Sequence, residues 1–277
     1  MKFTSINYLF PIAAALLLII LTACSNDSTS PELTEPPALP TDLTPVVIET
    51  QYFAVQDISD EDQYSNFKKV QQTALFGSTI LQSEGAISLL NSFLALAPLL
   101  NVKPELIDNS WVWTFNLSGF LKEADVIYQT SANPPSVTIT ATPSGNNIEW
   151  EVKFTGLLGE VNVQDFVFIT GTTANDFSSG EWRFFDPEGI TAATAVYNWQ
   201  IENETTKNAQ FVITSFGDFS DISIDYKRSG PEFSLNFEPS TGNYARIFWN
   251  IETHSGWYED YQTSRMCYTN FVNSECS

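Results

Sequence analysis

The sequence predicts an α+β fold that is mainly β, in which N-terminal helices precede a long antiparallel β-meander curled into a barrel or a concave sheet. From Trp111 almost to the C-terminus, apolar and polar residues alternate with period two, which is typical of antiparallel strands with one wet face. Turn-rich segments such as 133–135 and 239–243 separate successive runs. No helical stretch interrupts the runs, and this disfavours a parallel βαβ arrangement.

The alternation assigns side chains to two faces in each predicted strand. A meander of roughly a dozen strands cannot stay flat, so we expect its apolar face to curl inward. A transmembrane β-barrel is the alternative, because its strands also alternate. The apolar set includes Trp111, Trp113, Phe115, Ile148, Trp150, Val152, Tyr197, Trp199, Ile224, Tyr226, Phe233, Leu235, Ile247 and Trp249. The polar set includes Glu149, Glu151, Asn198, Gln200, Asp225, Lys227, Ser234, Asn236 and Arg246.

A helical segment is expected at 60–100, ahead of the strands. Ser59 is a suitable N-cap, and three acidic residues follow it where the helix dipole favours negative charge. Gly77 and Gly85 weaken the middle of the segment, so we expect two helices or one kinked helix. The stretch from Ala86 to Leu100 is apolar on nearly every face and therefore predicts a buried helix, placed as a plug or lid on the sheet.

The N-terminus reads as an export signal, residues 1–23. Lys2 is followed by an apolar run that is short for a membrane-spanning helix, and then by Leu21-Thr22-Ala23-Cys24. This tetrad resembles the lipobox of bacterial lipoproteins. The resemblance implies cleavage before Cys24, acylation of Cys24 and anchoring in a membrane. An ordinary secretory signal and an uncleaved anchor helix are the alternatives. In that class an Asp directly after the lipidated Cys often marks retention at the inner membrane. This chain has Ser25 there, so the resemblance implies the outer membrane of the cell envelope.

Residues 24–45 form the predicted lipidated tether. The segment is rich in Ser, Thr, Pro and acidic residues, a composition that cannot bury a core and that predicts a flexible chain. The remaining residues, 46–277, are expected to form a single globular β-rich domain, since their number suits one sizeable core.

The chain is strongly acidic, with 33 Asp and Glu against 12 Lys and Arg, a net charge of −21. Such a surface repels nucleic acid and anionic headgroups, so nucleic acid is excluded as a partner and membrane attachment is assigned to the lipid. We attribute this charge to solubility, with an acidic functional patch as the alternative.

Three cysteines are present, and lipidation of Cys24 would leave Cys267 and Cys276 as a pair. Export places them in an oxidising compartment, so we expect a disulfide that staples the C-terminal tail. Two free thiols or a metal pair are the alternatives. A metal site would need more ligands nearby, and the chain has a single histidine, His254.

Candidate catalytic groups are few. His254 is either a general base beside Glu252 or Ser255 or an ordinary turn residue, and Asp186 with Glu188 resembles a turn more than a glycosidase pair. The spacing of Asp218, Asp221 and Asp225 differs from that of an EF-hand. We therefore expect no catalytic residue, metal or cofactor, with an enzyme kept as an alternative.

The sequence favours a lipid-anchored envelope protein without catalytic activity. One hypothesis is that a hydrophobic ligand binds in the concave sheet, in the manner of the LolA and LppX type of periplasmic lipid carrier, which the outline resembles in architecture alone. The alternative is an interaction or structural module that meets protein or glycan through its outer face. Trp257, Tyr258 and Tyr261 are the first candidates for an exposed ligand-binding cluster.

Overall fold

The computed structural model describes residues 35–40, 42–54, 58, 61–83, 102–117, 135–158, 161–187, 193–216 and 219–276. The chain divides into two compact units, Met1–Pro36 and Pro37–Ser277. The second unit contains every described helix and strand. It also contains residues 37–45, which the sequence predicts to be part of the tether.

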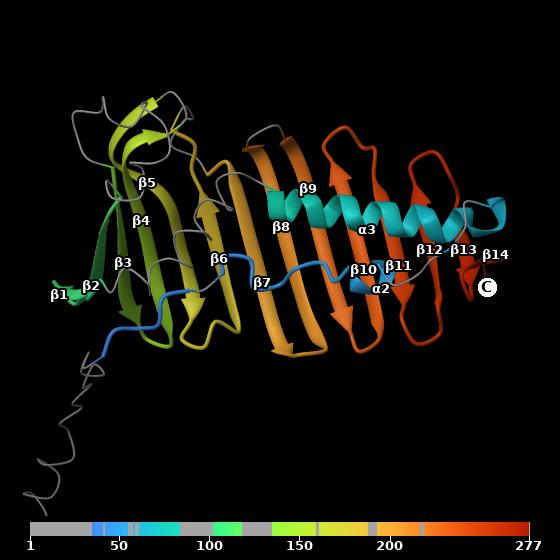
Figure 1. Ribbon diagram of the computed structural model, residues 1–277, viewed down its shortest axis with the longest axis horizontal. Helices are drawn as coiled ribbons and strands as arrows, with labels where there is room; N and C mark the ends of the chain where they lie inside the picture. Colours follow the sequence, from blue (N-terminus) through green and yellow to red (C-terminus); the bar gives the residue numbers. More distant parts are fainter. Residues whose placement is uncertain are drawn as a thin grey trace, which may run out of the picture. The chain divides into compact units, whose positions relative to one another are not determined.

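One antiparallel sheet dominates the second unit, as the alternation predicts. Its 14 strands are hydrogen-bonded in chain order, so each strand pairs with its neighbours in the sequence (Figure 1). The strands are β1 (Glu105–Ile107), β2 (Ser110–Asn116), β3 (Ser136–Ser144), β4 (Asn147–Leu158), β5 (Val161–Ala174), β6 (Ser179–Phe184), β7 (Ala195–Asn203), β8 (Thr206–Phe216), β9 (Phe219–Ser229), β10 (Glu232–Pro239), β11 (Ala245–Asn250), β12 (Ser255–Asp260), β13 (Met266–Thr269) and β14 (Val272–Ser274).

The sheet stays open, so the barrel form of the prediction is wrong. The short strands β1 and β14 are its two edges. Closure would hide the apolar face inside the sheet itself. In this chain the same face is instead covered by segments that precede the strands, which removes the need for closure.

One of these segments is the helix α3 (Ser65–Ser83), which follows the short elements α2 (Gln51–Ala54) and η1 (Asp62–Tyr64). It packs against β10 to β14 (Figure 1). Phe67, Val70 and Ala74 are spaced as one helix face requires, and all three are fully buried. Within the described residues, no helix is both long and apolar enough to cross a membrane.

The helix continues through Gly77, which the sequence analysis expected to weaken it. Gly77 is the point of close approach to the sheet, because a Cβ there would lie 2.9 Å from Leu235 Cδ2. Ser59 and the predicted apolar helix from Ala86 to Leu100 lie outside the described residues.

The second covering segment is the strap, residues 42–54, which lies on the same face as α3 (Figure 1). Near its start, the Val46 N–H donates to Tyr197 Oη at 3.1 Å, and that hydroxyl donates to the Val46 carbonyl at 2.7 Å. Burial raises the pKa of Tyr197 far above its ordinary value, so the phenol keeps the proton that it donates.

Charge and aromatic contacts hold the rest of the strap. Glu49 Oε1 and Oε2 each lie 2.8 Å from Arg228 Nη1, and Lys207 Nζ also pairs with Glu49. The Phe53 ring lies 5.4 Å from that of Trp249, measured between centroids. These contacts hold the strap against the covered face of the sheet.

Glycines allow large rings to lie flat on the covered face. Gly171 and Trp182 are cross-strand neighbours, and a Cβ on Gly171 would lie 2.0 Å from Trp182 Cε3. Gly180 is likewise the cross-strand neighbour of Trp199, and Gly256 that of Tyr268, and a Cβ on either glycine would clash with the neighbouring ring. Each glycine creates the space that an aromatic ring on the next strand fills.

Candidate binding face

The face of the sheet opposite α3 and the strap, here called the outer face, carries polar side chains in register. Strand pairing places ten of them, one from each of β3 to β12, in an unbroken cross-strand line, here called the polar row. At about 4.8 Å per strand, the row extends for roughly 43 Å. Its members are Thr142, Glu149, Thr172, Glu181, Asn198, Gln210, Asp225, Asn236, Arg246 and Glu259.

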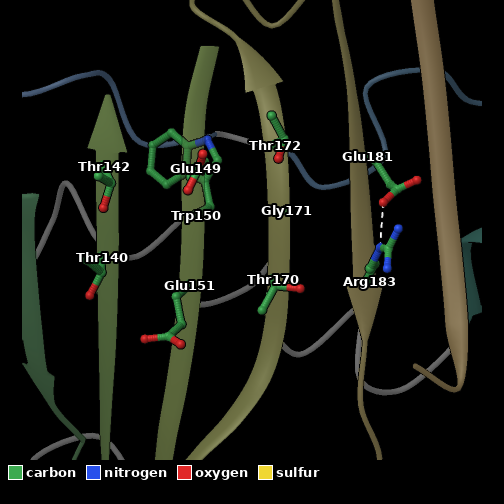
Figure 2. A pocket seen from close by; sticks show the side chains of 10 residues that line it. All are labelled: Thr140, Thr142, Glu149, Trp150, Glu151, Thr170, Gly171, Thr172, Glu181 and Arg183. Atoms are coloured by element: carbon green, nitrogen blue, oxygen red, sulfur yellow. Dashed lines mark hydrogen bonds and ion pairs between the residues drawn. The ribbon is translucent and has the colours of Figure 1, made fainter. Parts of the chain in front are cut away.

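One hollow on this face, here called the first, has a volume of about 540 Å³ and extends from β3 to β6. Figure 2 shows Thr140 and Thr142, Glu149 and Glu151, and Thr170 and Thr172 as i, i+2 pairs on neighbouring strands. On β6, Arg183 Nε lies 2.5 Å from Glu181 Oε1. Hydroxyls and carboxylates dominate this hollow, which gives it acidic character. The lining residues are Thr140, Thr142, Glu149, Trp150, Glu151, Thr170, Gly171, Thr172, Glu181 and Arg183.

The second hollow, of about 630 Å³, lies beside the first and is uncharged. Its polar walls are the amide quartet, defined as Asn198 and Gln200 on β7 with Asn208 and Gln210 on β8. Asn198 is the cross-strand neighbour of Gln210, and Gln200 that of Asn208, so the quartet is a two-by-two array. Ser179, Gly180 and Trp199 complete the lining.

The third hollow, of about 480 Å³, continues from β8 to β12. It shares Asn208 and Gln210 with the second hollow, so the two are continuous. Gln210 Nε2 donates to Asp225 Oδ1 at 2.7 Å across the strands. Lys227, Ser234, Asn236 and Arg246 add further polar groups, and Trp257 lines the β12 end.

The predicted cluster of Trp257, Tyr258 and Tyr261 is divided between the two faces. Trp257 stacks on Phe248 on the outer face at 6.2 Å, and the Arg265 guanidinium lies 4.0 Å above its ring. Tyr258 points the opposite way, where Lys69 Nζ of α3 lies 5.3 Å from its ring centroid. Burial, followed by the hydrogen bond to Asp260, raises the pKa of Tyr258 to about 12. Tyr261 is half exposed, beyond the end of β12.

The two C-terminal cysteines form the expected disulfide, Cys267–Cys276. Cys267 is the cross-strand neighbour of Trp257, so the bridge joins the tail to the outer face beside that ring. Cys24 lies outside the described residues.

His254 takes part in holding the strap. Its Nδ1 lies 3.2 Å from Tyr52 Oη, and its ring lies 4.9 Å from that of Phe271. Burial raises the pKa of Tyr52 to about 12, which keeps this hydroxyl protonated. The left-handed φ of 49° at His254 belongs to a turn between β11 and β12. These contacts give the residue a structural role.

The acidic candidates are described only in part. Asp225 belongs to the polar row, and Asp221 has a left-handed φ of 53°. Glu188 and Asp218 lie outside the described residues. Where the structure describes the chain, no group of three or more His, Cys, Asp and Glu side chains could hold a metal ion.

Sequence reasoning identified several members of the polar row as outward-facing, but it missed the row itself. Alternation assigns each side chain to a face, whereas the row depends on which residue of one strand opposes which residue of the next. Comparisons with family models, curated proteins and solved structures give no significant match, so the outer face is interpreted from its chemistry alone.

Proposed function

We propose that this protein is a lipid-anchored protein of the bacterial cell envelope that binds a glycan through the outer face of its sheet, without catalysis. The observation that carries this proposal is the set of three adjoining hollows along the polar row. A polar, solvent-exposed face is common in antiparallel sheets. Hollows lined in register by hydroxyl, amide and carboxylate groups, however, suit a ligand rich in hydroxyls.

The covered face favours this choice over the carrier hypothesis. Phe53 of the strap and Phe67 of α3 pack against the aromatic residues of the sheet, including Trp249 and Tyr268. In the part of the chain that the structure describes, these side chains occupy the apolar face where a hydrophobic ligand was expected. On the outer face, in contrast, side chains such as Asn208 and Gln210 are exposed among the described residues.

Attachment to the membrane is assigned to Cys24 on the basis of the Leu21-Thr22-Ala23-Cys24 tetrad. The test is to express the full chain with its own signal in a bacterium fed an alkyne-tagged fatty acid. We expect label and membrane partition for the natural chain, and loss of both in Cys24→Ala. Equal labelling of both proteins would exclude this anchor.

Glycan binding is tested by native affinity electrophoresis of the full chain in gels that contain single polysaccharides, neutral or anionic. At least one polysaccharide should retard the protein relative to a polysaccharide-free gel. If no gel in a broad panel of both classes retards it, the glycan proposal is wrong.

A further inference from the structure

We infer that the ligand is an uncharged, extended polysaccharide that runs across the strands along the polar row, with the amide quartet at the centre of its site. This inference rests on the proposed function and narrows it to one class of glycan and one direction of binding.

The direction follows from the arrangement of the hollows. The second and third hollows share Asn208 and Gln210, and the first and second meet on β6, which lines both. A chain in this path crosses a new strand about every 4.8 Å. That interval is close to the length of one sugar ring in an extended polysaccharide, so successive sugars would meet equivalent polar pairs.

The lining of the second hollow indicates that the ligand is uncharged. All seven of its lining residues are uncharged. The charges that flank it balance. On one side Glu181, the cross-strand neighbour of Asn198, pairs with Arg183. On the other side Asp225 and Lys227 are the cross-strand neighbours of Gln210 and Asn208. Two carboxylates and two cations therefore flank the quartet, so a charged sugar placed on it would meet no excess of opposite charge, and an uncharged sugar fits it best.

The chemistry of the quartet matches hydroxyl groups. A sugar hydroxyl donates one hydrogen bond and accepts others, and a side-chain amide offers both a donor and an acceptor. Gln200, Asn208 and Gln210 are exposed, so their amides are already directed to solvent. The hydrogen bond from Gln210 Nε2 to Asp225 orients that amide, leaving its oxygen available as an acceptor.

Other macromolecules fit this face less well. The polar row has four carboxylates and one guanidinium, which disfavours nucleic acid and also a second copy of the same face. The cores of protein–protein interfaces are depleted in charged residues and enriched in aromatic ones. On the outer face, aromatic rings gather at the β12 end, where Trp257 packs between Phe248 and Arg265 as an end wall.

The experiment measures the apparent affinity of the full chain by electrophoresis through gels with graded amounts of hydroxyethylcellulose or xylan, which are neutral, or alginate, which is anionic. The natural chain should be retarded by a neutral polysaccharide and not by alginate. The double variant Asn208→Ala/Gln210→Ala should bind about tenfold more weakly, since two hydrogen bonds are lost. Gln262→Ala removes an exposed amide in the turn after β12, off the polar row, and should bind as the natural chain does.

A charge variant separates this inference from the proposed function. Glu149→Gln/Glu181→Gln removes two carboxylates of the polar row and should allow retardation by alginate. Retardation of the natural chain by alginate alone would overturn the inference while sustaining glycan binding. Retardation by no polysaccharide would overturn both. Equal affinities of the quartet variant and Gln262→Ala, with unchanged circular dichroism, would show that the quartet is not the site.

Discussion

The two faces of the sheet differ in what fixes their side chains. On β11, Trp249 is fully buried between Phe53 and Phe233, whereas its neighbour Phe248 is half-buried against Trp257 on the outer face. On the covered face each ring depends on neighbours from the strap, the helix and adjacent strands, so its identity is constrained by packing. On the outer face, exposed polar side chains can hydrogen-bond to solvent. Packing therefore constrains their identity less, and they can be suited to a ligand.

The largest effect expected from this comparison is on stability. Trp249→Ala should lower the free energy of unfolding by about 3–5 kcal/mol, because the ring is fully buried and the cavity it leaves adds to the lost burial. Phe248→Ala on the same strand should cost about 1 kcal/mol, mainly the stack on Trp257. Urea denaturation followed by circular dichroism measures both. Similar losses in the two variants would mean that the faces are not energetically distinct.

A smaller contrast is expected between ion pairs on the two faces. Glu49→Gln should cost about 1–2 kcal/mol, because it leaves Lys207 and Arg228, whose side chains are only 18% and 17% exposed, without their carboxylate. Glu151→Gln breaks the pair with Lys153 on the outer face, where both side chains are 37% exposed, and should cost at most about 0.5 kcal/mol.

Salt sharpens that comparison. Denaturation at low and high salt should reduce the effect of Glu151→Gln and leave most of the effect of Glu49→Gln, since screening acts on exposed pairs. Limited proteolysis should also cut the strap of Glu49→Gln earlier than that of Glu151→Gln. Equal protection of the strap in both variants would show that Glu49 does not hold it.

The difference between the two faces also explains which strands could be predicted from the sequence. Alternation correctly separated Ile247 and Trp249 from Arg246, because a period of two is a local property of the chain. It did not reveal β12, whose inward positions are Gly256, Tyr258 and Asp260 and therefore form no apolar stripe. The sequence therefore predicts one exposed cluster of Trp257 and Tyr258, which the structure places on opposite faces.

Long-range partners were beyond sequence reasoning. The strap lies in a segment whose first residues read as tether, yet Leu43 and Val46 are buried and Glu49 pairs with residues from β8 and β9. Likewise, the amide quartet exists because Gln200 opposes Asn208, and only the register of β7 and β8 decides that. Local patterns predicted the faces, and tertiary pairing created the candidate site.

The smallest predicted effect concerns acid and the turn that ends β12. Hydrogen bonds to Asp260, first from the Thr263 side chain, outweigh desolvation and lower its pKa to about 2. A lowered folded-state pKa contributes stability that is present above the unfolded value of about 3.9 and is lost as pH falls toward 2. Asp260→Asn should therefore be less stable than the natural chain near neutral pH, and this deficit should shrink between about pH 4 and pH 2. Thr263→Ala should raise the pKa of Asp260 and so move this pH range upward, since the Thr263 hydroxyl makes the largest contribution to the lowered pKa. A deficit independent of pH in thermal melts would assign the effect to turn geometry instead of charge.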